Sequence, residues 1–353
     1  MKVSKYEFIR SPFVTREDTR ALKGYAILIM LFLHLFNNKE LDCTLEVWFY
    51  IKDIPLCYWL TRFATICVSL YMFLSGYGLY IVFKRHSKMN NVRRIMLLWS
   101  NVVLVAILFY PLSIAYPNLN WTFDVIGVIS TLSGFHPYNA EWWFLFPWMI
   151  ICLCSGVMLR VLNRYGKVKN ILLSILIWFI LRLGIYLSGG TDNWLNGPIR
   201  LLYEIEVVII LILPFLLGAV CAKYGVLKYF QVKGQKSILF RLVTIAIFIL
   251  LIYIRIFFIQ KGVFDAFIAM LFCCVILTIS KYTNNCFLRK LGEESTNMWL
   301  IHTFFCYYYC HNFIYSFKYP ILIYIVLTLI SYVAARIITF IYKPIQKSLF
   351  RNK

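Results

Sequence analysis

The chain has 353 residues, of which 61% are hydrophobic, and its mean hydropathy is +0.75. A water-soluble domain of this size needs far more polar surface, so the composition excludes an ordinary soluble protein and predicts that much of the chain faces lipid. The net charge of +21 does not indicate nucleic-acid binding, because Lys and Arg cluster in short segments between apolar runs and form no basic stripe along a helix face.

Apolar runs along the chain predict an all-α polytopic membrane protein with about ten transmembrane helices. A span needs about 20 mostly apolar residues to cross a hydrocarbon core of about 30 Å. Because no soluble domain, linker or repeat interrupts these runs, residues 1–353 are expected to form a single membrane-embedded domain. The expected spans are 21–37, 61–83, 94–115, 141–162, 170–187, 200–222, 237–259, 263–281, 295–313 and 319–342.

The distribution of basic residues predicts the orientation of these spans. Of the 36 Lys and Arg residues, 27 fall at the chain ends or in alternate connections, and only six fall on the opposite side. Cytoplasmic segments carry such an excess, so both termini are expected in the cytoplasm. Segment 116–140 lies on the other side and is too broken for a span, so a re-entrant or interfacial helix is expected there. The cytoplasmic segments are then 1–20, 84–94, 160–169, 223–241, 281–290 and 343–353.

The eleven Cys residues show no pattern typical of a metal site or a disulfide framework. Most lie singly inside apolar runs, and none has metal-ligand spacing with another Cys or a His. Cys in such places usually behaves as a small hydrophobe, so no metal is expected. The first apolar run ends without a small-residue cleavage site, which predicts a retained first helix.

Lys23 and His34 are the first candidates for chemistry. They stand 11 positions apart, so on a helix they share nearly one face and lie about 16 Å apart along the axis. His34 would lie near mid-membrane, where an ionisable group is costly and indicates function by default. A neutral imidazole can take a proton from an attacking hydroxyl. The spacing alone fits equally well a His bonded between helices and a Lys that reaches the membrane surface.

The connection after the second span is strongly basic, with Lys84, Arg85, Lys88, Arg93 and Arg94 within eleven residues. Guanidinium groups bind phosphates with paired hydrogen bonds, so this segment is a candidate site for a phosphorylated ligand. The same charges are also explained by the excess of Lys and Arg that cytoplasmic segments of membrane proteins usually carry.

Four short motifs occur in order along the chain, and together they resemble the acyltransferase 3 family of membrane O-acyltransferases. Each motif is weak alone, but the resemblance covers nearly the whole chain. The motifs are Leu22-Lys23-Gly24-Tyr25-Ala26-Ile27 running to His34, Phe73-Leu74-Ser75-Gly76-Tyr77, Glu141-Trp142-Trp143-Phe144-Leu145, and Leu291-Gly292-Glu293-Glu294-Ser295-Thr296-Asn297-Met298-Trp299-Leu300-Ile301-His302.

The resemblance implies transfer of an acyl group, with acetyl-CoA as the expected donor, from the cytoplasm to a hydroxyl of a surface polysaccharide or its lipid-linked precursor. It implies multi-pass residence in the inner (plasma) membrane, His34 as general base and Lys23 as its paired cation. The Arg-x-x-Arg motif of the family reads Asn91-Val92-Arg93-Arg94 here, so only Arg94 is matched. The expected CoA-phosphate ligands are Arg93, Arg94, Arg85 and Lys88.

The remaining motif positions are candidates for positioning the substrates. Ser75 and Gly76 suit polar positioning and close helix packing better than covalent catalysis, because no base stands near Ser75 in the sequence. Glu141 can bind the acceptor sugar or pair with a nearby Arg, and His302 at the depth of His34 is either catalytic or structural. The full set is Ser75, Gly76, Tyr77, Glu141, Trp143 and His302. The run 307–309 of three Tyr is expected to form part of an interfacial belt.

Two other classes of protein fit the sequence less well. A transporter or flippase for a glycan or lipid-linked sugar also has about ten spans and buried ionisable residues. Such transporters often contain inverted repeats, and no matching halves are found here. A structural membrane partner of a glycan synthase is the third class. For the enzyme, direct transfer and a covalent acyl-enzyme both fit the residues.

Overall fold

The computed structural model describes residues 12–349, apart from 39–44, 87–88, 120, 122–123, 136, 188–199, 260–261 and 280–284. Across the described residues the chain is helical, and its one sheet is an antiparallel hairpin of β1 (Tyr50–Ile51) and β2 (Ile54–Pro55). Both turn residues, Lys52 and Asp53, have positive φ, at 50° and 58°. A two-residue turn with this twist matches the twist of the strands that it joins.

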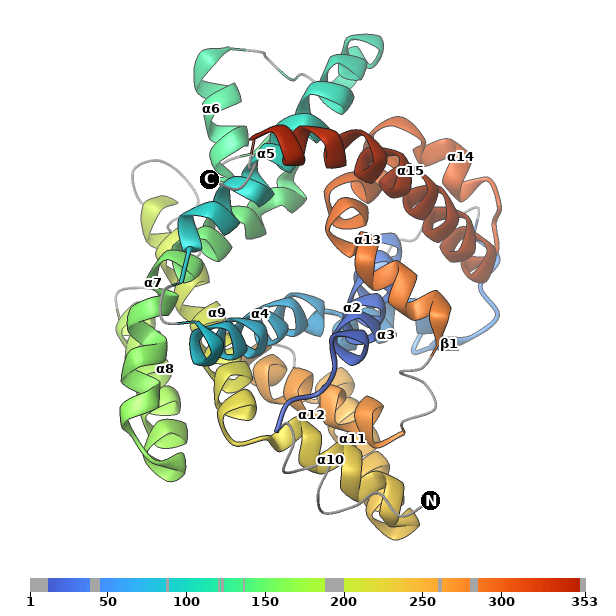
Figure 1. Ribbon diagram of the computed structural model, residues 1–353. Coiled ribbons are helices and arrows are strands. Elements are labelled where there is room, and N and C mark those ends of the chain that lie inside the picture. Colours follow the sequence, from blue (N-terminus) through green and yellow to red (C-terminus); the bar gives the residue numbers. More distant parts are fainter. Residues whose placement is uncertain are drawn as a thin grey trace.

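The helices form one bundle, which Figure 1 shows. They are α2 (Arg16–Phe36), α3 (Leu56–Ala64), α4 (Ile66–Arg85), α5 (Asn91–Phe109), α6 (Val125–Ser133), α7 (Leu145–Arg164), α8 (Lys167–Leu187), α9 (Arg200–Lys223), α10 (Val226–Lys236), α11 (Ile238–Phe257), α12 (Asp265–Thr278), α13 (Cys286–Thr303), α14 (His311–Tyr315) and α15 (Pro320–Leu349). Short 3-10 turns connect several of them, namely η1 (Tyr110–Ala115), η2 (Pro117–Leu119), η3 (Ala140–Phe144) and η4 (Gly262–Phe264), and the π-helix η5 (Phe304–Tyr309) continues α13.

Seven stretches of the described chain are long and apolar enough to cross a membrane. The prediction of a helical, polytopic membrane protein is therefore confirmed, while the number of ten spans stays a prediction. The expected span 170–187 lies within α8, whereas the expected span 263–281 contains the shorter apolar helix Asp265–Thr278. The expected span 295–313 is interrupted, because the helix changes to the π form after Thr303. Segment 116–140 holds the nine-residue helix α6, which is too short to span a membrane.

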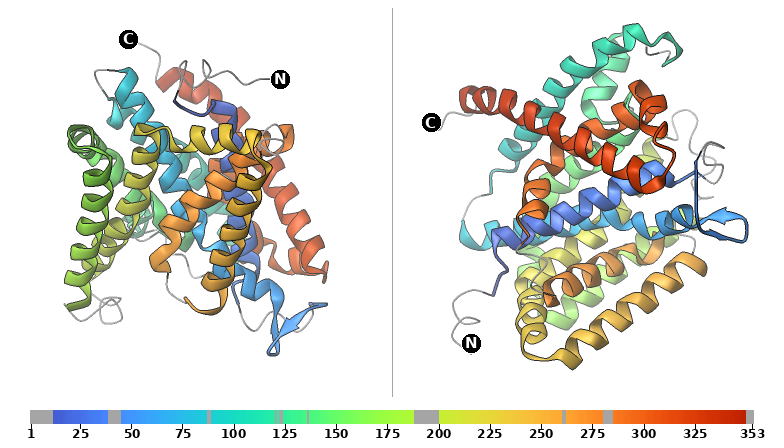
Figure 2. Two further views of the ribbon diagram at one scale, coloured as in Figure 1. Left: turned by 90° about the horizontal axis from the view of Figure 1, so that it is seen from below. Right: turned by 90° about the vertical axis from the view of Figure 1, so that its right-hand side faces the viewer.

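The start of α2 is fixed by local sequence. Thr15 and Asp18 form a capping box, in which the Thr15 hydroxyl accepts from the Asp18 amide and the Asp18 carboxylate accepts from the Thr15 amide. Gln231 of α10 donates to the same carboxylate at 3.2 Å, which ties the start of α2 to α10. The first turn of α2, the helix α10 and the end of α15 lie at one end of the bundle, and the β1–β2 hairpin lies at the opposite end (Figure 2).

Close glycine contacts set the register between α2 and α13. A Cβ atom at Gly24 would overlap the Leu288 carbonyl, and a Cβ atom at Gly292 would overlap the Arg20 carbonyl. Gly24 and Gly292 are therefore required for the two helices to approach this closely. Because both helices rise equally per residue from this crossing, His34 and His302, ten residues further on each helix, reach the same depth.

A second glycine contact joins α4 to α9. A Cβ atom at Gly76 would overlap the Phe215 carbonyl, and one at Gly218 would overlap the Phe73 carbonyl. Gly76 belongs to the second sequence motif, and its side of α4 is turned toward α9. This contact leaves the side of α4 that carries Ser75 facing the interior of the bundle, where the candidate site lies.

Candidate active site

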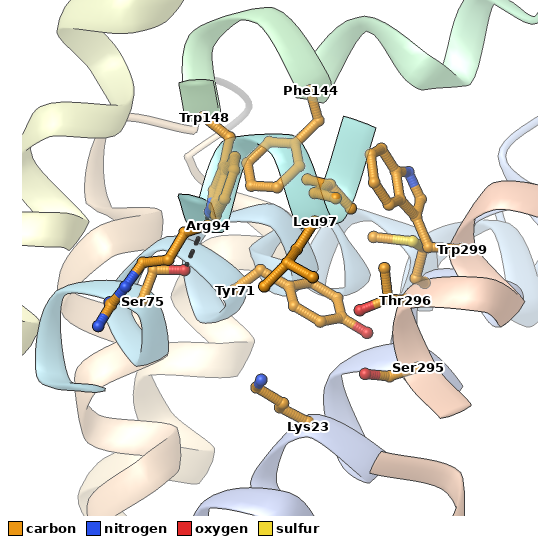
Figure 3. A pocket seen from close by; sticks show the side chains of 12 residues that line it. Lys23, Tyr71, Ser75, Arg94, Leu97, Phe144, Trp148, Ser295, Thr296 and Trp299 are labelled. Carbon is orange, nitrogen blue, oxygen red and sulfur yellow. Dashed lines mark hydrogen bonds between the residues drawn. The ribbon is translucent and has the colours of Figure 1, made fainter. Parts of the chain in front are cut away.

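A cavity of about 310 Å³ lies between α2, α4, α5, α7 and α13 (Figure 3). All four sequence motifs and Arg94 of the basic segment contribute to its wall, although they are spread over nearly 280 positions of the chain. Its lining residues are Lys23, Met30, Tyr71, Ser75, Arg94, Leu97, Leu98, Phe144, Trp148, Ser295, Thr296 and Trp299.

Two cations line the cavity toward the starts of α2 and α5. Lys23 is in the second turn of α2, and Arg94 is in the first turn of α5. Within the described part of the chain, the Lys23 ammonium forms neither a hydrogen bond nor an ion pair with another residue. An anionic ligand that entered from this end would meet both charges, and the guanidinium of Arg94 has the geometry for phosphate.

Of the other predicted phosphate ligands, Arg85 and Arg93 are exposed and do not line the cavity. Lys88 lies outside the described residues. Asn91, which stands where the family motif has its first Arg, donates from its amide nitrogen to the Ser155 hydroxyl at 3.0 Å. This position therefore joins α5 to α7, and Arg94 is the one residue of the motif that reaches the cavity.

Hydroxyl groups line the middle of the cavity. The Tyr71 hydroxyl is buried and, among the described residues, has no hydrogen-bond partner, although Ser295 lies near it in Figure 3. The Ser75 hydroxyl accepts a bond of 3.4 Å from the Trp148 indole. A buried hydroxyl without a partner is costly, so a polar ligand that bonded Tyr71 would recover this energy.

The far end of the cavity stops below His34. Met30 lines the wall one helical turn before His34, about 6 Å lower along the axis of α2. Trp299 and Phe144 line this end, with their rings packed edge to face at 5.7 Å. The Trp299 indole donates to the Glu141 carbonyl at 3.2 Å, so the end of the cavity is held directly against the segment that carries Glu141.

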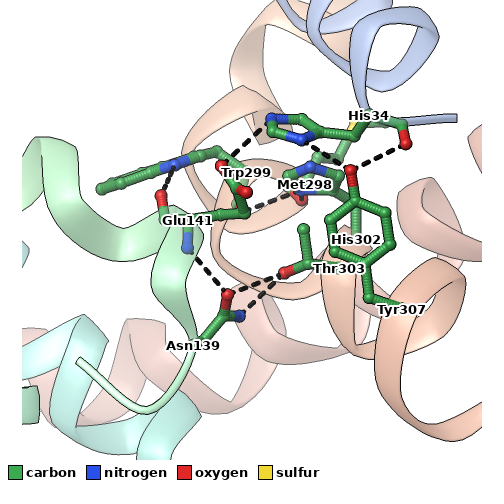
Figure 4. A network of polar contacts seen from close by, with 8 residues as sticks. All are labelled: His34, Asn139, Glu141, Met298, Trp299, His302, Thr303 and Tyr307. Carbon is green, nitrogen blue, oxygen red and sulfur yellow. Dashed lines mark hydrogen bonds and ion pairs between the residues drawn. The ribbon is translucent and has the colours of Figure 1, made fainter. Parts of the chain in front are cut away.

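His34 lies at the centre of a polar cluster (Figure 4). Its side chain is only 10% exposed, its Nε2 atom lies 3.5 Å from a carboxylate oxygen of Glu141, and its Nδ1 atom lies 3.1 Å from the hydroxyl of Tyr307. The tyrosine hydroxyl also donates to the His34 carbonyl at 2.8 Å. Both ring nitrogens therefore have polar neighbours, which come from η3 and η5.

The ring of His302 lies beside that of His34, with centroids 5.0 Å apart. The prediction that the two imidazoles reach one depth is confirmed. His302 is fully buried, and its Nδ1 atom contacts two carbonyls of its own helix, those of Met298 at 3.1 Å and Trp299 at 2.9 Å. Its Nε2 atom has no partner among the described residues. His302 is thus anchored through one nitrogen and leaves the other available.

Asn139 holds Glu141 in place. Its side-chain oxygen accepts from the Glu141 amide at 3.2 Å and from the Thr303 hydroxyl at 3.1 Å, and its amide nitrogen lies 2.7 Å from the same hydroxyl. Asn139 is fully buried, so this exchange connects the start of η3 to the end of α13. The result is that the Glu141 side chain faces His34.

Three predicted positioning residues belong neither to the cavity wall nor to the cluster around His34. Gly76 faces α9, and the fully buried Tyr77 accepts a 3.0 Å bond from the Val14 amide, which holds the segment before α2. Trp143 packs edge to face on Phe144, with ring centroids 6.0 Å apart, and does not line the cavity. Within this motif Phe144 reaches the cavity instead.

Sequence reasoning missed the tyrosine that contacts His34. The three tyrosines at 307–309 were expected in an interfacial belt, and this is wrong for Tyr307, whose hydroxyl points into the bundle at His34. The next residue but one, Tyr309, also bonds inward, to the Phe109 carbonyl at 2.8 Å. The π-helix determines where these side chains point, and neither the apolarity of the segment nor the spacing of its residues predicts a π-helix. Sequence reasoning also missed Tyr71 and Trp148, which line the cavity but belong to none of the four motifs.

Among the described residues, no three His, Cys, Asp or Glu side chains are grouped so that they could hold a metal ion. The cluster around His34 presents imidazole, carboxylate and phenol groups at one end of a cavity whose other end is cationic. This arrangement suits proton transfer at one end and anion binding at the other.

Comparison with known proteins assigns the family. Residues 18–341, nearly the whole chain, match the family of the acyltransferase domain. No curated protein and no solved structure matches the chain. The matched region contains the cavity lining and the cluster around His34. The chain therefore belongs to the acyltransferase 3 family and is a membrane acyltransferase.

Proposed function

We propose that this protein transfers an acetyl group from cytoplasmic acetyl-CoA to a hydroxyl of a cell-surface polysaccharide or its lipid-linked precursor, in the inner membrane. The observation that supports the proposal best is the cavity itself. It begins at two cations, Lys23 and Arg94, and ends against the segment that presents Glu141 to His34. A long donor with phosphates at one end and a thioester at the other matches this order of groups.

On the donor side, Arg94 and Lys23 would bind CoA phosphates, and the hydroxyl-lined middle would receive the pantetheine arm. The unpartnered Tyr71 hydroxyl supports this, because an amide of the arm can bond it. The far end is lined by the aromatic rings of Trp299 and Phe144, and a cavity of about 310 Å³ suits a short acyl group such as acetyl better than a long chain.

On the acceptor side, His34 removes the proton of the hydroxyl as its oxygen attacks the thioester carbonyl carbon. The C–S bond breaks, and the CoA thiolate leaves and takes up the proton from His34. Glu141, 3.5 Å from the imidazole, stabilises the imidazolium that forms in between. We propose direct transfer and not an acyl-enzyme on Ser75, because among the described residues its hydroxyl bonds only the Trp148 indole, which cannot serve as a base.

The test is release of the CoA thiol by purified protein from acetyl-CoA, with a panel of methyl glycosides as probe acceptors. His34→Ala should lower the rate about 100- to 10,000-fold, which is the range of a general base. His311→Ala is the matched control, because His311 is an exposed histidine whose ring packs on that of Tyr315 and which does not line the cavity. A full rate in His34→Ala would contradict the role of His34.

The same assay separates the enzyme from a glycan transporter. The enzyme binds acetyl-CoA and releases thiol in a protein-dependent way. Glycan transport by purified protein that neither binds acetyl-CoA nor releases thiol would overturn the donor assignment.

A further inference from the structure

The Tyr307 hydroxyl contacts two atoms of one residue. It lies 2.8 Å from the His34 carbonyl oxygen and 3.1 Å from the His34 Nδ1 atom. Tyr307 is in the π-helix η5, and His34 is in the last turn of α2, so this double contact joins elements that are 273 residues apart in the sequence. Figure 4 shows the hydroxyl between the carbonyl and the ring.

This geometry determines which ring nitrogen of His34 carries a proton. A carbonyl oxygen only accepts, so Tyr307 must donate its single proton to the His34 carbonyl. The hydroxyl oxygen can then only accept from the ring, and Nδ1 must be the donor. In the opposite assignment, with Tyr307 donating to Nδ1, two oxygen atoms would face each other at 2.8 Å with no proton between them.

The other nitrogen of His34 faces Glu141. The distance from Nε2 to the carboxylate oxygen is 3.5 Å, longer than a strong hydrogen bond. Nε2 either carries a proton, as in an imidazolium beside the carboxylate, or lacks one, as in a neutral imidazole beside the carboxylate or beside a protonated carboxyl. In every one of these states Nδ1 keeps its proton, and the proton that moves is on the side of Nε2.

We propose that Tyr307 is a positioning residue, which holds His34 with Nδ1 protonated so that Nε2 exchanges the proton with the acceptor hydroxyl. This rests on the proposed function and deepens it. His302 shows the same arrangement, because its Nδ1 atom is held by two backbone carbonyls and its Nε2 atom is left without a partner among the described residues. Both imidazoles of the cluster thus present Nε2.

The direct test is nitrogen NMR of protein labelled with 15N at the imidazole rings, at a pH where the His34 ring is neutral. Protonated and unprotonated ring nitrogens resonate far apart, and a difference spectrum against His34→Gln assigns the His34 signals among the five histidines. We expect a protonated Nδ1 and an unprotonated Nε2 in the wild type, and a shift toward protonated Nε2 in Tyr307→Phe. A protonated Nε2 in the wild type would overturn the proposal.

The kinetic test compares Tyr307→Phe with Tyr315→Phe. Tyr315 is the matched control, because its hydroxyl donates to the next carbonyl of α2, that of Leu35, also at 2.8 Å, instead of bonding the His34 ring. In Tyr307→Phe, kcat should fall about 10- to 100-fold while the KM for acetyl-CoA stays within about twofold, since a misplaced ring proton impairs the base and not donor binding. Equal effects of the two substitutions would reduce Tyr307 to a helix-packing role.

The proposed function and the positioning role of Tyr307 can fail independently of each other. If the protein released no thiol at all, the proposed function would be wrong, and the NMR measurement would still decide the state of His34. If thiol release depended on His34 but Tyr307→Phe kept the wild-type kcat, the acyltransfer would stand and the positioning role would fall.

Discussion

At the scale of single residues, α2 carries the two groups on which the proposed donor path depends. Lys23 reaches the cavity near its cationic end, and His34 stands about 16 Å further along the same face. Their separation suits a ligand that places phosphates and a reacting carbonyl far apart. The neighbouring cations Arg85 and Arg93 are exposed to solvent, so they contribute attraction without shaping the cavity.

Lys23 therefore has a testable role in donor binding. Lys23→Met should raise the KM for acetyl-CoA about tenfold or more, because a hydrogen bond to a charged group is worth about 1.5–3 kcal/mol. Lys84→Met is the matched control, since Lys84 is an exposed cation at the end of α4 that does not line the cavity. Steady-state kinetics measure the KM for acetyl-CoA in both variants. An equal rise in this KM in both would mean that only the general positive charge matters.

At the scale of helices, the bundle depends on two pairs that approach through glycine. The α2–α13 contact sets His34 and His302 at one depth, and the α4–α9 contact turns Ser75 toward the cavity. The motif glycines Gly24, Gly76 and Gly292 thus act on the site through helix register. In lipid, where burial of apolar surface drives little association, such close backbone packing is a main source of stability.

The α4–α9 contact gives a stability prediction with an internal control. Gly76→Ala places a methyl group on the Phe215 carbonyl and should destabilise the protein by about 1–3 kcal/mol. Gly78→Ala, two residues along the same helix, meets nothing within 4 Å and should be neutral or stabilising by up to about 1 kcal/mol. Thermal unfolding in detergent measures both, and a lower midpoint for Gly78→Ala than for Gly76→Ala would contradict this account of the contact.

At the scale of the whole molecule, two ends of different character can be distinguished. The starts of α2 and α5, which carry Lys23 and Arg94, adjoin the cationic end of the cavity. The β1–β2 hairpin lies at the opposite end of the bundle (Figure 2), and the residues beside it, Trp48 and Phe49, expose large aromatic side chains. Aromatic residues favour the membrane surface, which is consistent with the hairpin marking the outer interface.

This orientation can be tested by thiol labelling of intact cells with a reagent that does not cross membranes, with each labelled position identified by peptide mass spectrometry, because the chain also has eleven native Cys residues. A Trp48→Cys protein should be labelled from outside. A Lys236→Cys protein, altered at the end of α10, should be labelled only after lysis, as should the native exposed Cys286 at the start of α13. Labelling of position 236 in intact cells would reverse the predicted orientation.

Sequence alone determined the membrane class, the helical fold and the family, because these follow from composition and from motifs that are local in the chain. It also placed His34 and His302 at one depth, since a helix rises by a constant amount per residue. The number of spans was less predictable, because α12 is short and α13 changes to a π-helix where apolarity continues.

Only the tertiary structure decided which groups surround His34. Glu141 and Tyr307 come from segments 107 and 273 residues away, and their contacts depend on how η3 and η5 pack against α2. Likewise, it separated Ser75, which reaches the cavity, from Gly76 and Tyr77, which pack the helices. Adjacent residues of a helix point about 100° apart. Consecutive residues of one motif therefore face different neighbouring helices, and they serve different roles once the helix is packed in the bundle.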